Sequence, residues 1–142
     1  MAKILIAYAS RTKKTAKIAN VLKEMFEEKG HEVEVKDCKE ISDAKELENY
    51  DCLIFGSATY HGTMMKPMET FLFLAEQANL RDKVGGAFGS YGWSGEAPQR
   101  IHDTMESIFG MKMPAKPLKI KVAGGKPQKE APSFVEAIVK EL

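Results

Sequence analysis

The stretch Lys3–Ala9, KILIAYA, and the polar residues after it decide the fold. It is a continuous apolar run of strand length, and such runs form strands covered on both faces, as in a parallel sheet between helices. Residues 16–29 then repeat apolar side chains at helical spacing, and Gly30 ends this helix. The opening residues therefore predict a strand, a polar turn and a helix, the first unit of an α/β fold.

The remainder of the chain repeats this alternation of strands and helices. Strands are expected at residues 3–9, 31–37, 51–58, 83–90 and 118–124. Helices are expected at residues 16–29, 42–47, 67–78, 96–109 and 132–142. We expect Ile108 and Val122 to face the core. Strict alternation predicts a doubly wound parallel sheet of five strands in a three-layer sandwich, with residues 1–142 forming a single domain.

Composition excludes several classes of protein. The chain has 142 residues, with 21 Lys and Arg against 20 Asp and Glu, for a net charge of +1. A nucleic-acid-binding protein would need a basic excess, so no nucleic-acid partner is expected. No secretory signal or membrane span is visible, so we expect a cytoplasmic protein that does not bind membranes. Two cysteines, Cys38 and Cys52, are too few for a disulfide framework, and both are expected to be reduced and buried.

Charge is spread unevenly along the chain. Residues 1–22 carry five basic and no acidic side chains, whereas residues 23–51 carry five basic and eleven acidic ones. The first block contains the loop after the first strand. A protein that docks there need not be basic.

The loop after the first strand predicts a phosphate site. Three hydroxyls and three cations lie at the start of a helix: Ser10, Arg11, Thr12, Lys13, Lys14 and Thr15. A helix N-terminus offers unpaired N–H groups and partial positive charge, which bind phosphate. The alternative is a simple Ser or Thr N-cap beside solvated basic residues. Neither a Walker loop nor a dinucleotide-binding glycine motif is present.

Two later loops carry aromatic side chains and glycines. After the third strand come Ser57, Ala58, Thr59, Tyr60, His61 and Gly62, with Met64 and Met65 beyond them. After the fourth come Ser90, Tyr91, Gly92, Trp93, Ser94 and Gly95. Each aromatic ring taken alone could simply pack against the rest of the protein. Because ligands bind at the carboxyl ends of such strands, the three loops together predict a site for a flat ring with a phosphate tail.

This order of motifs resembles the flavodoxins, over essentially the whole chain. Residues 87–96, AFGSYGWSGE, look especially like the flavodoxin-like module of flavodiiron proteins. The resemblance implies a flavodoxin-like fold with strand order 2-1-3-4-5, non-covalent FMN and one- or two-electron redox chemistry. It implies that Ser10 through Thr15 hold the FMN phosphate, and that Ala58 through Gly62 and Ser90 through Gly95 line the two sides of the ring.

The resemblance also assigns a role to the dipeptide His61-Gly62. In flavodoxins a peptide bond in this loop turns its carbonyl toward the flavin N5 atom after one-electron reduction, and glycine can adopt the positive φ that such a turn requires. Tyr60, Tyr91 and Trp93 are the candidate ring contacts. The chain departs from the family pattern at Lys13, where glycine is usual, and in its lack of the common acidic character.

The sequence thus favours a flavoprotein of electron transport: an FMN-binding carrier between redox partner proteins, with no catalytic side chain of its own. The alternative is an FMN-dependent NAD(P)H:quinone or protein oxidoreductase. Di-iron chemistry on oxygen or nitric oxide would need an iron protein on a separate polypeptide, because no metal-ligand motif is present. A phosphorylated receiver domain lacks its required aspartates here. A cofactor-free interaction domain on the same scaffold is a further alternative. Met64 and Met65 could form an adaptable apolar surface for a redox partner or for a second subunit of a homodimer.

Overall fold

The computed structural model describes residues 1–10 and 13–142. Its centre is a parallel sheet in the order β2-β1-β3-β6-β7. The five strands are β1 (Lys3–Ala9), β2 (Glu32–Asp37), β3 (Cys52–Ser57), β6 (Val84–Tyr91) and β7 (Leu118–Lys121). Counted along the chain, these strands have the order 2-1-3-4-5, so the expected doubly wound topology is confirmed.

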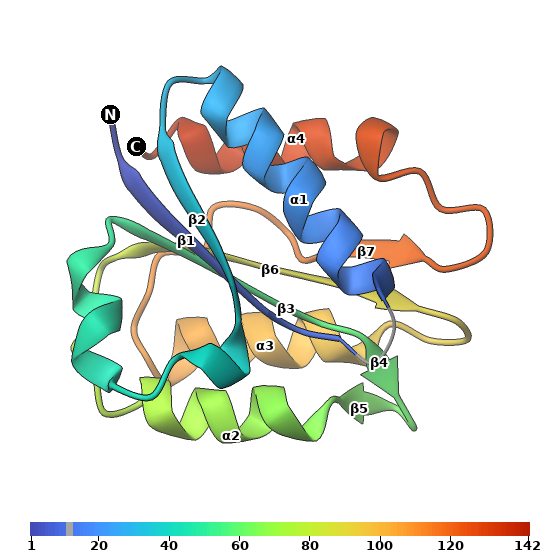
Figure 1. Cartoon of the computed structure of the whole chain (residues 1–142), viewed down its shortest axis with the longest axis horizontal. Helices are drawn as coiled ribbons and strands as arrows, with labels where there is room; N and C mark the ends of the chain where they lie inside the picture. Colours follow the sequence, from blue (N-terminus) through green and yellow to red (C-terminus); the bar gives the residue numbers. More distant parts are fainter. Residues whose placement is uncertain (11–12) are drawn as a thin grey trace.

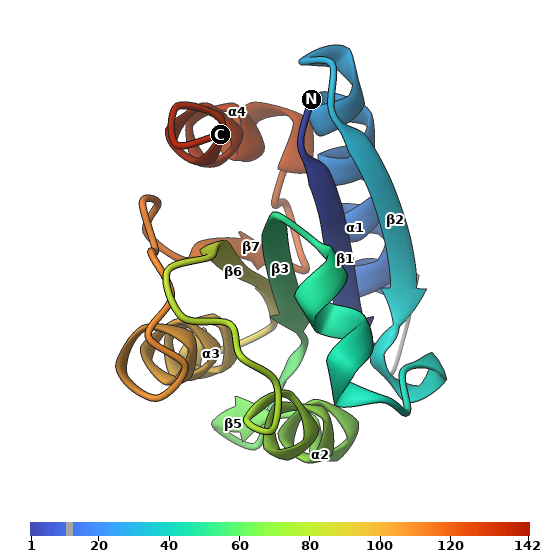
Figure 2. The same cartoon turned by 90° about the vertical axis from the view of Figure 1, so that its left-hand side faces the viewer.

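Helices cover both faces of the sheet (Figures 1 and 2). One face carries α1 (Lys13–Glu28) and α4 (Pro127–Val139). The other carries α2 (Lys66–Ala75), α3 (Glu96–Ser107) and two 3-10 helices, η1 (Cys38–Glu40) and η2 (Ala44–Asn49). The result is the expected three-layer sandwich.

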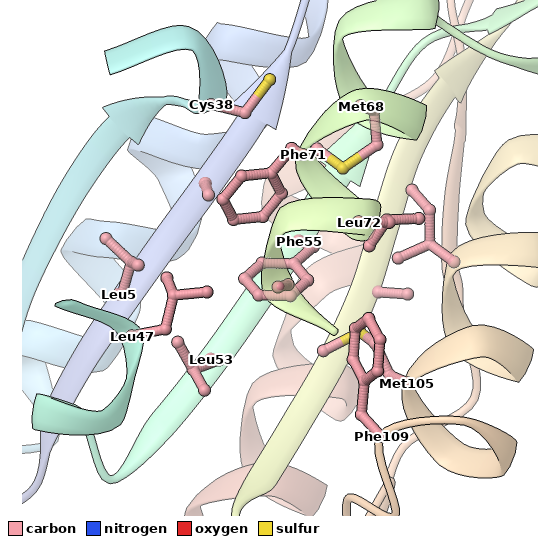
Figure 3. Packing of buried hydrophobic residues seen from close by; sticks show 14 of the residues in the cluster. Leu5, Cys38, Leu47, Leu53, Phe55, Met68, Phe71, Leu72, Met105 and Phe109 are labelled. Atoms are coloured by element: carbon pink, nitrogen blue, oxygen red, sulfur yellow. The ribbon is translucent and has the colours of Figure 1, made fainter. Parts of the chain in front are cut away.

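Each face has its own hydrophobic core, because neighbouring side chains of a strand point to opposite sides. In β1, Ile4 and Ile6 join the core under α1 and α4, whereas Leu5 and Ala7 join the core under α2 and α3. Figure 3 shows the second core, where the rings of Phe55 and Phe71 meet edge to face at a centroid distance of 4.9 Å. Aromatic pairs favour this arrangement.

The two cysteines lie in different cores and are not bonded to each other. Cys38 belongs to the α2 and α3 side and Cys52 to the α1 and α4 side. Both thiols are buried and free, as expected. Burial raises the pKa of Cys38 to about 12 and raises that of Cys52 as well.

Several element ends differ from the sequence predictions. α3 ends at Ser107, so Ile108 is 61% exposed and Phe109 takes the core position instead. β7 ends at Lys121, which leaves Val122 42% exposed. The prediction that Ile108 and Val122 face the core was wrong, because it extended the periodicity of α3 and β7 beyond the residues at which they end.

Two helices also begin elsewhere than expected. The helix after Ser42 is the 3-10 helix η2, and Asp43 caps it by accepting the Lys45 N–H at 3.0 Å. The last helix begins at Pro127 rather than Pro132, because Pro127 suits the first turn and Glu130 Oε2 accepts the Lys126 N–H at 2.9 Å.

The expected loop after β3 contains a small hairpin, β4 (Thr59–Tyr60) and β5 (Thr63–Met64). Met64, expected at the surface, is only 8% exposed because β5 packs beside α3. Met65 is partly buried, and Met68 on α2 is fully buried, as expected. Among the described residues, no helix combines the length and apolar character needed to cross a bilayer.

Candidate functional site

Three loops meet at the carboxyl edge of the sheet. They join β1 to α1, β3 to α2 and β6 to α3, and Figure 1 shows these strands ending and these helices beginning on the right-hand side of the molecule. β1 and β3 are neighbours whose connections lead to opposite faces of the sheet. This reversal is where ligands bind in doubly wound folds.

The loop from β1 to α1 leads into a helix whose first turn is cationic. In α1, Lys13 and Lys14 are exposed, and the first turn holds no acidic residue. Two lysines at this end oppose the helix dipole, so a bound anion would relieve the repulsion. Just before the helix, the buried Ser10 Oγ has no hydrogen-bond partner within the described part of the chain. The expected site residues Arg11 and Thr12 lie outside the described residues.

Thr15 connects this loop to β6. Thr15 is fully buried, and its Oγ1 lies 2.9 Å from Oγ of Ser90, which is 3% exposed. One hydroxyl of this pair donates to the other, which leaves the second O–H for another acceptor. The structure therefore brings together two predicted site residues that are 75 positions apart in the sequence.

The loop from β3 to α2 is held by its own hydrogen bonds. Ser57 Oγ donates to the Ala58 carbonyl at 2.9 Å and accepts the Met65 N–H at 3.0 Å. Thr59 Oγ1 accepts the Ala97 N–H at 3.1 Å, which satisfies an amide at the start of α3. Ser57 is fully buried, so its hydroxyl supports the loop from within rather than facing solvent.

His61 and Gly62 form the two-residue turn of the β4–β5 hairpin. Both have positive φ, 51° at His61 and 75° at Gly62, as in a type I′ turn. Positive φ is uncommon for a residue with a side chain, although histidine adopts it more readily than most. The Tyr60 and His61 rings lie 4.2 Å apart between centroids, and Tyr60 is 45% exposed. Gly62 therefore adopts the positive φ that the sequence analysis expects of a glycine in this turn.

The loop from β6 to α3 presents aromatic side chains with little support. Tyr91 is half-buried at the end of β6, whereas the Trp93 side chain is 97% exposed. Gly92 is exposed, and Gly95 precedes the first residue of α3. Trp93 therefore offers a large ring surface to a ligand or partner.

Gly89 fixes the spacing between the two aromatic loops. A Cβ at Gly89 would lie 2.2 Å from the Ser57 carbonyl oxygen, which is closer than two atoms can pack. Only glycine allows the ends of β3 and β6 to approach this closely.

Glu96 is a residue that the sequence reasoning left without a role. Its Oε2 would lie 3.7 Å from a Cβ at Gly62, so the carboxylate is next to the hairpin turn. Hydrogen bonding by the Ser94 side chain, and then by its own backbone N–H, holds the pKa of Glu96 below its usual value. The sequence could have indicated a role for Glu96 from its position as the first residue of α3, because acidic residues are favoured in the first turn of a helix.

These features fit FMN. The cationic helix end suits a phosphate, as does Ser10 Oγ, which has no partner among the described residues. Two loops with exposed aromatic rings suit a flat ring system. Among the described residues there is no group of three His, Cys, Asp or Glu side chains that could hold a metal ion.

Comparison with known proteins places the chain in a family. The model of the Flavodoxin family matches residues 6–133, and the chain belongs to this family. The rubredoxin-oxygen oxidoreductase of Megalodesulfovibrio gigas is 33% identical over 122 residues, which cover 84% of this chain and 30% of that protein. The chain spans less than a third of the first curated relatives that it matches.

Solved structures agree with this family. An archaeal flavodoxin has a TM-score of 0.86 at 30% identity, covering 98% of this chain and 97% of that one. Oxidised Flavodoxin 2 from Bacillus cereus has a TM-score of 0.89 at 30% identity, covering 99% of this chain and 100% of that one. Flavodoxins bind FMN, so the expected fold, family and cofactor are confirmed.

Proposed function

We propose that this chain is an electron carrier that binds FMN at the carboxyl edge of its sheet and exchanges electrons with redox partner proteins. The observation that supports this most strongly is the meeting of three loops there, one ending in a cationic helix N-terminus and two carrying aromatic side chains. Family membership supports electron transfer in general.

Each loop would have its own task. Ser10 through Thr15 would bind the phosphate, with the Thr15–Ser90 pair supplying a hydroxyl donor. Tyr60, Tyr91 and Trp93 would lie against the ring and exclude water from it. His61 and Gly62 would place a backbone carbonyl near the reacting edge, since glycine permits the turn to change. When bound, FMN supplies one- and two-electron chemistry; the chain binds it and sets its environment.

The short loops favour a carrier over a reductase. The hairpin turn has two residues, and four residues, 92–95, separate β6 from α3. A reductase needs room for a nicotinamide over the flavin ring, which longer loops or a second subunit would have to build. Neither described loop is long enough to form such a pocket by itself.

The nature of the partners is a separate part of the proposal. Because residues 87–96 resemble the flavodoxin-like module of flavodiiron proteins, we include a di-iron protein that reduces oxygen or nitric oxide among the acceptors. The test is to mix the FMN-loaded, reduced chain anaerobically with a purified di-iron protein and to follow flavin reoxidation. No acceleration above buffer would contradict this assignment.

The carrier proposal itself is tested by reconstitution. Apoprotein should bind one FMN, and reductive titration should show two separate one-electron steps. Stopped-flow mixing with NADPH should leave the flavin oxidised on the timescale of seconds. Rapid bleaching by NADPH would favour the reductase, and absence of FMN binding would contradict both.

A further inference from the structure

A groove separate from the aromatic loops lies between α1 and the segment that joins β7 to α4. Its volume is about 260 Å³. Figures 1 and 2 show α1 and α4 together on this face of the sheet. The groove reaches the candidate phosphate site at one end, because Lys14 and Ser90 line both.

The walls of this groove are cationic. Lys14 and Lys17 come from α1, and Lys121 and Lys126 come from the end of β7 and the start of α4. None of the residues that line the groove is Asp or Glu. The nearby Glu130 carboxylate accepts the backbone N–H of Lys126 at 2.9 Å. The groove thus concentrates positive charge in a concave space, where it attracts an anion more strongly than on a flat surface.

The floor of the groove is aliphatic. Ile18 and Ile120 are 2% and 3% exposed and form its base, while Val122 at its rim is 42% exposed. Val21 completes this surface from the next turn of α1. An apolar surface with a few convergent polar groups around it is typical of small-molecule sites. The ligand should therefore combine an apolar part with a negative group.

We propose that this groove binds the adenylate part of a nucleotide, with its phosphate against the lysines and its purine against Val21, Ile120 and Val122. The concave shape favours a small ligand over an acidic protein surface. Because FMN occupies the cofactor site, the nucleotide would be a separate molecule, either a free adenine nucleotide or a dinucleotide such as NADPH. The inference goes beyond the proposed electron carrier and does not depend on FMN binding.

Calorimetric titration of the FMN-loaded protein with ADP tests the groove directly. We expect saturable binding, and the variant Lys17→Glu/Lys121→Glu should raise the Kd about tenfold or more, because two charges near the phosphate are reversed. Lys140→Glu reverses one lysine just after the other end of α4, the same charge change as Lys126→Glu, and should leave the Kd within about twofold. The single variant Lys126→Glu repeats the test if the double variant folds poorly. No saturation with ADP, or equal losses in the control, would overturn the proposal.

Fragments and competitors define the ligand class. Adenosine and inorganic diphosphate should each bind at least about tenfold more weakly than ADP, because each lacks one half of the recognised group. Equal binding of diphosphate would overturn the purine assignment. Tighter binding of a poly-glutamate peptide than of ADP would overturn the nucleotide in favour of an acidic protein.

A competition experiment separates the two sources. If the groove takes a dinucleotide, NADPH should displace ADP from the FMN-loaded protein. If it takes only a free nucleotide, NADPH should leave ADP binding unchanged. Loss of ADP binding with normal FMN binding would remove this inference alone. Failure of FMN binding with intact ADP binding would remove only the carrier proposal.

Discussion

The two aromatic loops of the candidate site are built in opposite ways. The loop from β3 to α2 is held by hydrogen bonds from Ser57 and Thr59 and ends in a paired hairpin. The loop from β6 to α3 leaves Trp93 97% exposed. One loop has its shape before any ligand arrives, whereas the other offers a surface that a ligand would cover.

This difference separates stability from binding. Changes in the hairpin loop should lower the stability of the apoprotein, because they remove contacts that already exist. Changes at Trp93 should affect only the complex, because the side chain makes few contacts without a ligand. Measuring both quantities for the same variants would show whether the contrast is real.

The largest effect is expected where the two loops meet. Gly89→Ala places a Cβ against the Ser57 carbonyl, and backbone atoms cannot move aside as a flexible side chain can. We expect a loss of about 3 kcal/mol in the free energy of unfolding. Chemical denaturation of the apoprotein measures it. The control is Gly92→Ala, whose Cβ would meet nothing within 4 Å; an equal loss there would contradict the close-approach argument.

The hydrogen bonds of the hairpin loop give the next effect. Ser57→Ala removes an acceptor from the Met65 N–H and should destabilise the apoprotein by about 1.5 kcal/mol. Thermal and urea unfolding measure the change. Ser42→Ala, at an exposed position, is the matched control. If Ser57→Ala left stability unchanged but weakened FMN binding, the loop would be shaped by its ligand instead.

Trp93→Ala tests the opposite loop. The apoprotein should keep its stability within about 0.5 kcal/mol, as for other exposed positions. The Kd for FMN should rise about fivefold, which corresponds to an aromatic contact of about 1 kcal/mol. Quenching of flavin fluorescence measures the affinity. A large loss of stability with unchanged affinity would reverse the comparison.

The smallest effect concerns Glu96, which lies between the two loops. Folding lowers its pKa, so its contribution to stability is present above the unfolded pKa and is lost as pH falls through the folded value. Glu96→Gln should therefore flatten the acid side of the pH–stability curve. Denaturation midpoints across the acid range measure this, and an unchanged acid limb would show that Glu96 is not electrostatically coupled to its surroundings.

The fold could be predicted because its signals are local and strong. Apolar runs such as Lys3–Ala9 have the length and pattern of buried parallel strands, and α1 shows a clear helical stripe. The three loops could be predicted as one site because parallel strands bring their carboxyl ends to the same edge.

Other features depend on tertiary contacts that periodicity does not show. The hairpin strands have two residues each, which is too short for a pattern. Met64 is buried because β5 packs beside α3. The pairing of Thr15 with Ser90 depends on how α1 lies on β6, and only the folded chain reveals it.

The positions of the two cysteines have a practical consequence for measurement. One thiol lies on each side of the sheet, both are buried, and burial keeps both protonated. Thiol reagents attack the ionised form, so the native protein should react slowly at both positions. A surface cysteine added by mutagenesis could therefore carry a dye without removing the native pair. The slow modification of Cys38 and Cys52 would, in turn, report how often each half of the interior opens.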